Sequence, residues 1–164
     1  MKIREIIFFV IIAVMFPLSA VAQVQSPSGA TSVSATASSS EVREAEVRDF
    51  LGNYVDRYNQ KDTDGFLSLF SAEAVQNQSE RIGRIRRIYT NFFEQSHELK
   101  YQIVEPKIEI FQNGVEVKAR YEITQTPRGG GGKRVWKGNG SWFLIKEDGG
   151  LRVLYLTYQH QKAL

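Results

Sequence analysis

The spacing of the apolar residues changes once along this chain, and that change constrains the fold more than any other feature. Between residues 42 and 95, apolar residues recur every three or four positions, which is the period of an amphipathic helix. From 99 to 161 they recur every second position, as in a strand with one buried face. Helices followed by consecutive strands predict an α+β domain, with N-terminal helices packed on a curved antiparallel sheet of about four long strands.

The helical part is predicted to hold three helices. The apolar stripe over 42–60 is wide and aromatic, as suits a long helix lying across a sheet. Asp62 or Thr63 can then cap a short second helix. A third helix is expected over 81–95, after a short extended piece around 74–77.

The second part is predicted to hold four strands joined by short turns. Pro106 interrupts the first of them, so we expect a bend or an edge position there. Asn113-Gly114 is a strong hairpin signal, and a glycine-rich loop separates the second strand from the third. The expected strands are 99–111, 115–125, 133–147 and 151–161.

The first 22 residues have the pattern of a cleaved signal peptide. Lys2 and Arg4 precede an uninterrupted apolar run over 6–16, and the small-x-small pattern of Ala20-Val21-Ala22 follows it. As a helix that run rises about 16 Å, short of a hydrocarbon core of roughly 30 Å. We therefore expect a periplasmic or secreted protein, which would be membrane-anchored if the segment stayed uncleaved.

Residues 23–40 carry no charge and consist largely of Ser, Ala and Thr. Such a segment cannot bury enough apolar surface to offset its ordering entropy, so it is predicted to be a flexible leader. The folded domain is then expected over 41–164. Its near neutrality (21 Lys+Arg and 18 Asp+Glu over the whole chain) and its expected export argue against a nucleic-acid partner.

The residue types exclude several kinds of chemistry. The chain has no Cys, which removes disulfides, thiol catalysis and cysteine-ligated metal sites. The two histidines, His97 and His160, are far apart and belong to no metal-binding motif, so neither a metal nor a cofactor is expected.

Two groups of residues resemble the SnoaL-like branch of the nuclear transport factor 2 (NTF2)-like superfamily. The first is Tyr54-x7-Asp62, Asp64-Gly65-Phe66-x3-Phe70 and Ala74-Val75; the second is Trp142-Phe143-Leu144-x3-Asp148-Gly149 followed by 151–158. The resemblance covers nearly all of 42–161. It implies an open cone, with a pocket between the long first helix and the concave face of the sheet, often in a homodimer.

The same resemblance implies how the chain departs from the ketosteroid isomerases, which use a carboxylate base and an oxyanion hole. Tyr54 stands where the oxyanion tyrosine would be, whereas the base position falls on Gln78 and the protonated-acid position on Ser141. Because a glutamine amide does not titrate near neutral pH, it cannot abstract a proton. We therefore expect no reaction of that type.

The leading prediction is an exported, non-catalytic domain that binds a small apolar or amphipathic molecule, or a protein partner, in its cone as a homodimer. The residues predicted to line the pocket combine aromatic walls with a few polar groups, as small-molecule sites do. They are Tyr54, Tyr58, Gln78, Ser141, Phe143, Leu154 and Tyr158.

Two other functions stay open. One is a lyase or isomerase that uses Tyr54 with His160, since His160 shares a predicted strand face with Tyr158 and an imidazole titrates near neutral pH. The other is a purely structural envelope module whose cone is filled by its own side chains.

Two surfaces are candidates for association. A homodimer would cover an apolar sheet face, for which the candidate residues are Trp136, Trp142, Leu144 and Tyr155, although these could instead pack under the helices. Arg81, Arg84 and Arg87 step by three along the third helix. That ridge is expected to be a solvated helix face, with a weak attraction to an anionic polymer or membrane surface as the alternative.

Overall fold

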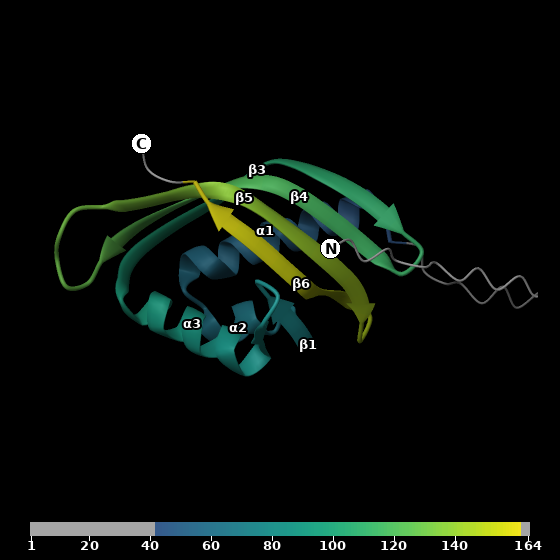
Figure 1. Ribbon diagram of the computed structural model, residues 1–164, viewed down its shortest axis with the longest axis horizontal. Helices are drawn as coiled ribbons and strands as arrows, with labels where there is room; N and C mark the ends of the chain where they lie inside the picture. The colour runs from purple at the N-terminus through teal and green to yellow at the C-terminus, as the bar shows by residue number, and fades with distance from the viewer. Residues whose placement is uncertain (1–41, 162–164) are drawn as a thin grey trace, which may run out of the picture. The chain divides into compact units, whose positions relative to one another are not determined.

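A computed structural model describes residues 42–161, which form three helices and one six-stranded sheet. The predicted signal peptide and leader lie outside the described residues. The helices are α1 (Glu44–Gln60), α2 (Thr63–Leu67) and α3 (Ile82–Glu94). The strands are β1 (Phe70–Gln76), β2 (Glu80–Arg81), β3 (Ser96–Phe111), β4 (Gly114–Pro127), β5 (Arg134–Glu147) and β6 (Gly150–His160). In Figure 1 the sheet arches over the helices.

The sheet confirms the α+β prediction and corrects two of its details. Its strand order is β2-β1-β6-β5-β4-β3, so β1 and β2 extend the four predicted strands to six. β1 runs parallel to β6, which makes the sheet mixed rather than purely antiparallel. A parallel pairing joins segments far apart in sequence, so local periodicity does not reveal it.

Three local features predicted from the sequence are present in the structure: a helix cap, a hairpin turn and a strand irregularity. Asp62 caps α2, its side chain accepting a hydrogen bond from the Gly65 N–H at 3.0 Å. The Asn113-Gly114 turn joins β3 to β4. The expected irregularity at Pro106 is a shift of strand register between Val104 and Lys107.

The core consists largely of aromatic side chains between the helices and the concave face. Phe66 is fully buried, and its ring centroid lies 4.8 Å from those of Tyr54 and Tyr89. On β4, Val115, Val117 and Tyr121 face this core while the charged residues that alternate with them along the strand face outward, as the pattern predicts. The long helix α1 therefore packs on the sheet mainly through aromatic side chains.

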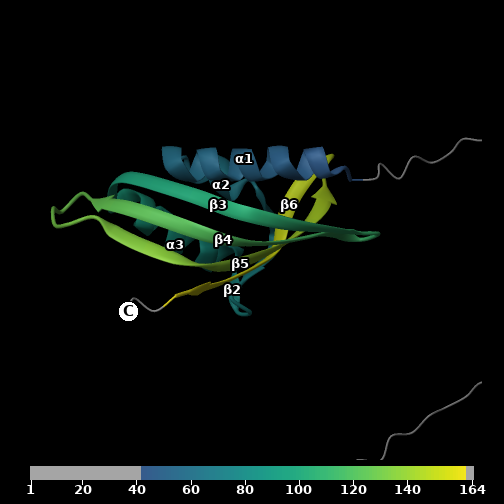
Figure 2. The same ribbon diagram turned by 90° about the horizontal axis from the view of Figure 1, so that it is seen from above.

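β3 forms one of the two edges of the sheet and lies along α1, as Figure 2 shows. Asn59 of α1 accepts a hydrogen bond from the Tyr101 N–H at 2.6 Å and donates one to the Tyr101 carbonyl at 3.4 Å. The Lys61 ammonium donates to the carbonyls of Ser96 and His97 at 3.1 and 2.6 Å. Side chains of α1 and of Lys61, the residue that follows it, thus satisfy backbone groups that an edge strand would otherwise expose.

We expect Asn59→Ala to lower the free energy of unfolding by about 1–3 kcal/mol, because it leaves a partly buried backbone N–H and carbonyl without partners. Asn53→Ala is the matched control. Asn53 lies on the same helix but is exposed and bonds only to Arg57, so its loss should cost less than about 0.5 kcal/mol. Urea denaturation of both variants measures the difference; equal destabilisation would contradict the edge-capping role.

Among the described residues, no helix is long and apolar enough to cross a membrane.

Candidate functional site

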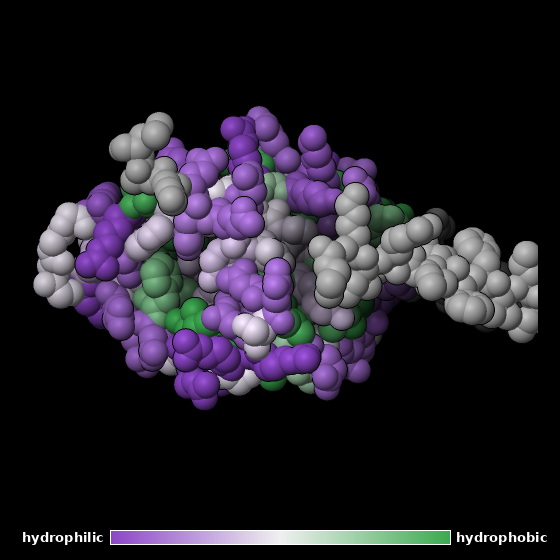
Figure 3. Space-filling view, in the orientation of Figure 1, coloured by the Kyte–Doolittle hydropathy of each residue, from purple (hydrophilic) through white to green (hydrophobic). Residues whose placement is uncertain are grey.

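A cavity of about 390 Å³ lies between α1, α3 and the concave face of the sheet. Its volume is within the range of small-molecule sites. Figure 3 looks toward its mouth, where apolar side chains are visible between polar residues of α3 below and of the sheet above. The lining residues come from six elements: Tyr54, Tyr58, Ile88, Tyr89, Asn91, Phe92, Gln95, Tyr101, Tyr121, Ile123, Trp136, Trp142, Leu156, Tyr158 and His160.

Two glycines of β5 make room for the rings on the cavity wall. A Cβ on Gly138 would lie 2.7 Å from the Tyr121 hydroxyl, and one on Gly140 would lie 2.5 Å from the Trp142 ring. A larger residue at Gly140 would displace the Trp142 ring, and one at Gly138 would also collide with the Gln159 backbone carbonyl of β6. Glycine within a strand is typical of such close approaches.

The polar groups of the cavity are almost all neutral. Of the described residues, those that line it include no Asp, Glu, Lys or Arg, while six contribute phenol hydroxyls. Burial raises the pKa values of Tyr58, Tyr89 and Tyr101 well above the ordinary value. These phenols therefore remain protonated at neutral pH and can donate hydrogen bonds. The interior suits the uncharged part of a ligand.

Two hydrogen-bond donors lie together at the inner end of the cavity. Burial raises the pKa of Tyr54, and the neighbouring Trp142 indole and Tyr89 hydroxyl partly oppose that rise. The Trp142 side chain is almost completely buried, and its Nε1–H has no hydrogen-bond partner of acceptable geometry. Because the Trp142 nitrogen has no surface open to the cavity, its N–H acts on the neighbouring Tyr54 and not directly on a ligand.

A buried hydrogen-bond chain holds the wall behind these donors. The Tyr89 hydroxyl donates to Gln76 Oε1 at 3.0 Å, and Gln76 Nε2 donates to Glu80 Oε2 at 2.8 Å. Gln76 is fully buried at the end of β1. The sequence interpretation missed it and selected Gln78, two residues further on.

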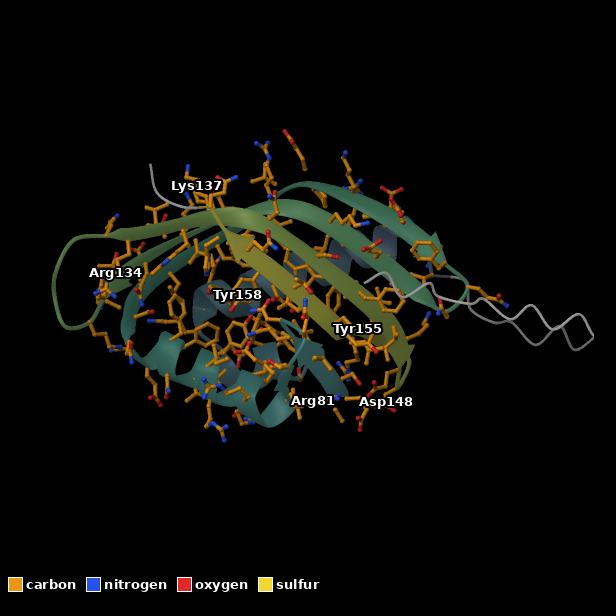
Figure 4. The ribbon with its side chains drawn as sticks, viewed as in Figure 1. Arg81, Arg134, Lys137, Asp148, Tyr155 and Tyr158 are labelled. Atoms are coloured by element: carbon orange, nitrogen blue, oxygen red, sulfur yellow. The ribbon has the colours of Figure 1, made fainter. Side chains whose placement is uncertain are left out.

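A tyrosine–histidine pair lies near the mouth. Tyr121 Oη and His160 Nδ1 are 2.8 Å apart, and the pKa of Tyr121 is raised to about 12 by burial and by nearby Tyr158. His160 itself is exposed. The pKa of Tyr158 is also raised, by burial and then by the negative charge of Glu80. In Figure 4, Tyr158 lies between β6 and α3.

The structure brings some of the predicted pocket residues together and separates others. Tyr54, Tyr58 and Tyr158 line the cavity, as does His160 from the alternative enzymatic prediction. Whether any of them contacts a ligand stays a prediction.

Four predicted pocket residues lie elsewhere. Gln78 is exposed in the β1–β2 turn with a φ of 70°. Ser141, Phe143 and Leu154 are on the outer face of the sheet, where Ser141 Oγ donates to Glu116 Oε1 at 3.3 Å. These four residues therefore do not line the cavity of the cone, although the sequence predicted that they would.

A β-bulge explains the error on β6. Phe143 pairs with Tyr155 but Leu144 pairs with Val153, so β6 has one extra residue, Leu154. The extra residue reverses the alternation of faces, and strict alternation from Tyr158 back to Leu154 gives the wrong side. Nothing in the local sequence marks this bulge.

The predicted dimer face is divided between the two sides of the sheet. Trp142 and Leu144 are buried in the core, and Trp136 lines the cavity with its ring centroid 5.8 Å from that of Phe92. Only Tyr155 is on the outer face, where it is 52% exposed. The four residues therefore do not form one surface, because three of them pack under the helices.

Among residues 42–161, no group of three or more potential ligands is arranged to hold a metal ion. That observation does not test the prediction that the protein uses no metal or cofactor.

A helical layer under a strongly curved sheet, with a cavity opening at one end, defines a cone-shaped α+β domain. No protein-family model matches the sequence, and a comparison with curated proteins finds no match. Among solved structures, an NTF2-like superfamily protein from Salmonella enterica is similar, with 17% identity and a TM-score of 0.64. That match covers 73% of this chain and 93% of the other.

Two further structures share the architecture. A candidate scytalone dehydratase from Novosphingobium aromaticivorans has 7% identity and a TM-score of 0.67, over 71% of this chain and 83% of that one. A candidate NTF2-like dehydratase from Streptomyces avermitilis has 10% identity and a TM-score of 0.63, over 73% and 96%. Residues 42–161 thus have the NTF2-like fold. At these identities the likeness concerns the fold alone.

Proposed function

We propose that this protein binds a small, largely apolar molecule in the cavity of its cone, with a hydrogen-bond acceptor of that molecule against the phenol hydroxyls of the lining. The observation that carries the proposal is the 390 Å³ cavity itself, lined by aromatic rings and neutral phenol hydroxyls, with no Asp, Glu, Lys or Arg among the described residues that line it. Rings provide the contact area, and the donors provide orientation.

Binding without catalysis accounts best for the lining residues. A proton-transfer enzyme needs a group that changes protonation state near the working pH. The buried phenols do not meet that need, because their pKa values are raised further from neutrality. The fold is also that of the candidate dehydratases, but their catalytic roles do not transfer at 7–10% identity.

The neutral fluorophore N-phenyl-1-naphthylamine tests this proposal. We expect saturable fluorescence enhancement with one site per chain. Asn91→Trp should weaken binding at least about tenfold, because Asn91 is exposed at the mouth and a large ring there obstructs entry. Glu94→Trp is the control: Glu94 is exposed on the same helix and does not line the cavity. Equal effects of the two variants, or no saturable binding, would contradict the proposal.

A second candidate is an enzyme of the lyase or isomerase kind, favoured by the 2.8 Å contact between Tyr121 Oη and His160 Nδ1 in the same cavity as Tyr54. His160 could take a proton while Tyr54 stabilises negative charge on a substrate oxygen. In that case His160→Ala would abolish turnover but leave binding of the fluorophore unchanged. Export and homodimer formation also remain part of the proposal.

A further inference from the structure

The mouth of the cavity is bordered by arginines, in contrast to its uncharged interior. Ile88 and Asn91 of α3 and Gln95, the residue that follows the helix, line the cavity. Arg84 and Arg87 lie one helical turn before Ile88 and Asn91, so they extend the same side of the helix. Both side chains are exposed.

Two further arginines lie at the other end of the mouth. The Arg128 N–H donates to the Gln95 carbonyl at 2.8 Å, which holds the β4–β5 loop against the end of α3. Arg134 precedes Trp136 by two residues and shares its strand face. In Figure 4, Arg134 lies near the C-terminal end of α3.

These four arginines are not neutralised by neighbouring carboxylates. Seven other basic residues within 42–161 form ion pairs: Arg48, Arg57, Arg86, Lys118, Arg120, Lys137 and Lys146. None of the four mouth arginines has a carboxylate of this region within 4.0 Å. Glu94 and Glu98 are nearby in sequence, but Glu98 accepts from Thr126 and neither forms an ion pair. Glu80 places one negative charge near Tyr158, but the four guanidinium groups at the mouth form no ion pair within residues 42–161.

We infer that the ligand of this cavity is an amphipathic anion, with an apolar body inside and one carboxylate, sulfonate or phosphate group outside, against Arg84, Arg87, Arg128 and Arg134. The inference rests on the proposed function, because it concerns the same cavity. The interior excludes the charge, since nothing charged lines it and desolvating an unpaired anion is costly. Guanidinium groups suit such anions, because they donate two parallel hydrogen bonds.

Two probes that differ by one charge test the inference. 1-Anilinonaphthalene-8-sulfonate is N-phenyl-1-naphthylamine with an added sulfonate. We expect the full chain to bind the sulfonate at least about threefold more tightly at low salt. That preference should disappear near 0.5 M NaCl, where the Debye length is only a few Å.

Charge reversal at the mouth should affect only the charged probe. The double variant Arg84→Glu/Arg87→Glu and the single variant Arg134→Glu should each lower the sulfonate affinity, the double variant at least about fivefold. Their affinity for the neutral probe should change less than about twofold. The control is Arg86→Glu, which changes the net charge by the same two units as Arg134→Glu. Arg86 is on the opposite flank of α3, paired with Asp64 at 3.1 Å.

Several results would overturn the inference. One is equal affinity for the two probes in the wild-type chain, and another is an equal loss in Arg86→Glu. A third is a pair of results in the mouth variants: the sulfonate still binds, but binding to phosphatidylglycerol vesicles is lost. That outcome would show that these arginines bind an anionic membrane surface and not the ligand of the cavity. Failure of the neutral probe to bind the wild-type chain would instead overturn the proposed function, and this inference with it.

Discussion

Raising the pH from 9 to 11 is expected to lower the free energy of unfolding by about 5 kcal/mol through four buried tyrosines. Tyr54, Tyr58, Tyr89 and Tyr101 have pKa values raised by burial in the folded state. In the unfolded chain their pKa is about 10. Above that pH the unfolded state loses protons that the folded state keeps, so the folded state loses stability as the pH rises. Each group contributes about 1.4 kcal/mol over this interval.

Urea denaturation at pH 9, 10 and 11 measures this dependence. Tyr101→Phe should reduce the loss by about 1.4 kcal/mol, since it removes one of the four phenols. Tyr155→Phe is the control, because Tyr155 is 52% exposed on the outer face. Ionisation of Lys and Arg is common to all three chains and cancels in the comparison. An identical pH dependence in wild type and Tyr101→Phe would contradict the burial of that hydroxyl.

Phe66→Ala is expected to lower the free energy of unfolding by about 3–5 kcal/mol, the usual cost of removing a buried ring. The Phe66 side chain is fully buried, with ring centroids of Tyr54 and Tyr89 at 4.8 Å, Phe70 at 5.4 Å and Tyr58 at 5.5 Å. Three of these neighbours line the cavity. The variant should therefore also weaken binding of N-phenyl-1-naphthylamine, because the cavity wall loses its support.

Guanidinium denaturation of Phe66→Ala measures the stability loss, and probe titration measures the effect on the wall. The control is Phe111→Ala. Phe111 is 47% exposed at the tip of the β3–β4 hairpin, so truncation there should cost less than about 1 kcal/mol and leave probe affinity unchanged. A loss below about 1.5 kcal/mol for Phe66→Ala would show that the site collapses around the missing ring.

The sequence specified most of the local structure because the signals for it are local. The 3.6-residue stripe of α1, the Asp62 cap and the alternation along β4 each depend on neighbouring residues. The cavity tyrosines on α1 could be predicted from the same stripe, combined with the resemblance to a known cone-shaped fold. The alternation along β4 predicts that Tyr121 faces the core. Nothing in that strand predicts its hydrogen bond with His160 on β6.

Tertiary structure alone decided which side chains meet at the site. The extra residue at Leu154 reversed the faces of β6, and the turn after Gln76 moved Gln78 out to solvent. The parallel pairing of β1 with β6 fixed the position of Gln76 beside Leu156, and the packing of α3 on β1 brought the Tyr89 hydroxyl to its side chain. Periodicity reports which face of an element is apolar. Register, bulges and curvature arise from contacts between distant segments, and they determine where a cavity opens and which polar groups enter it.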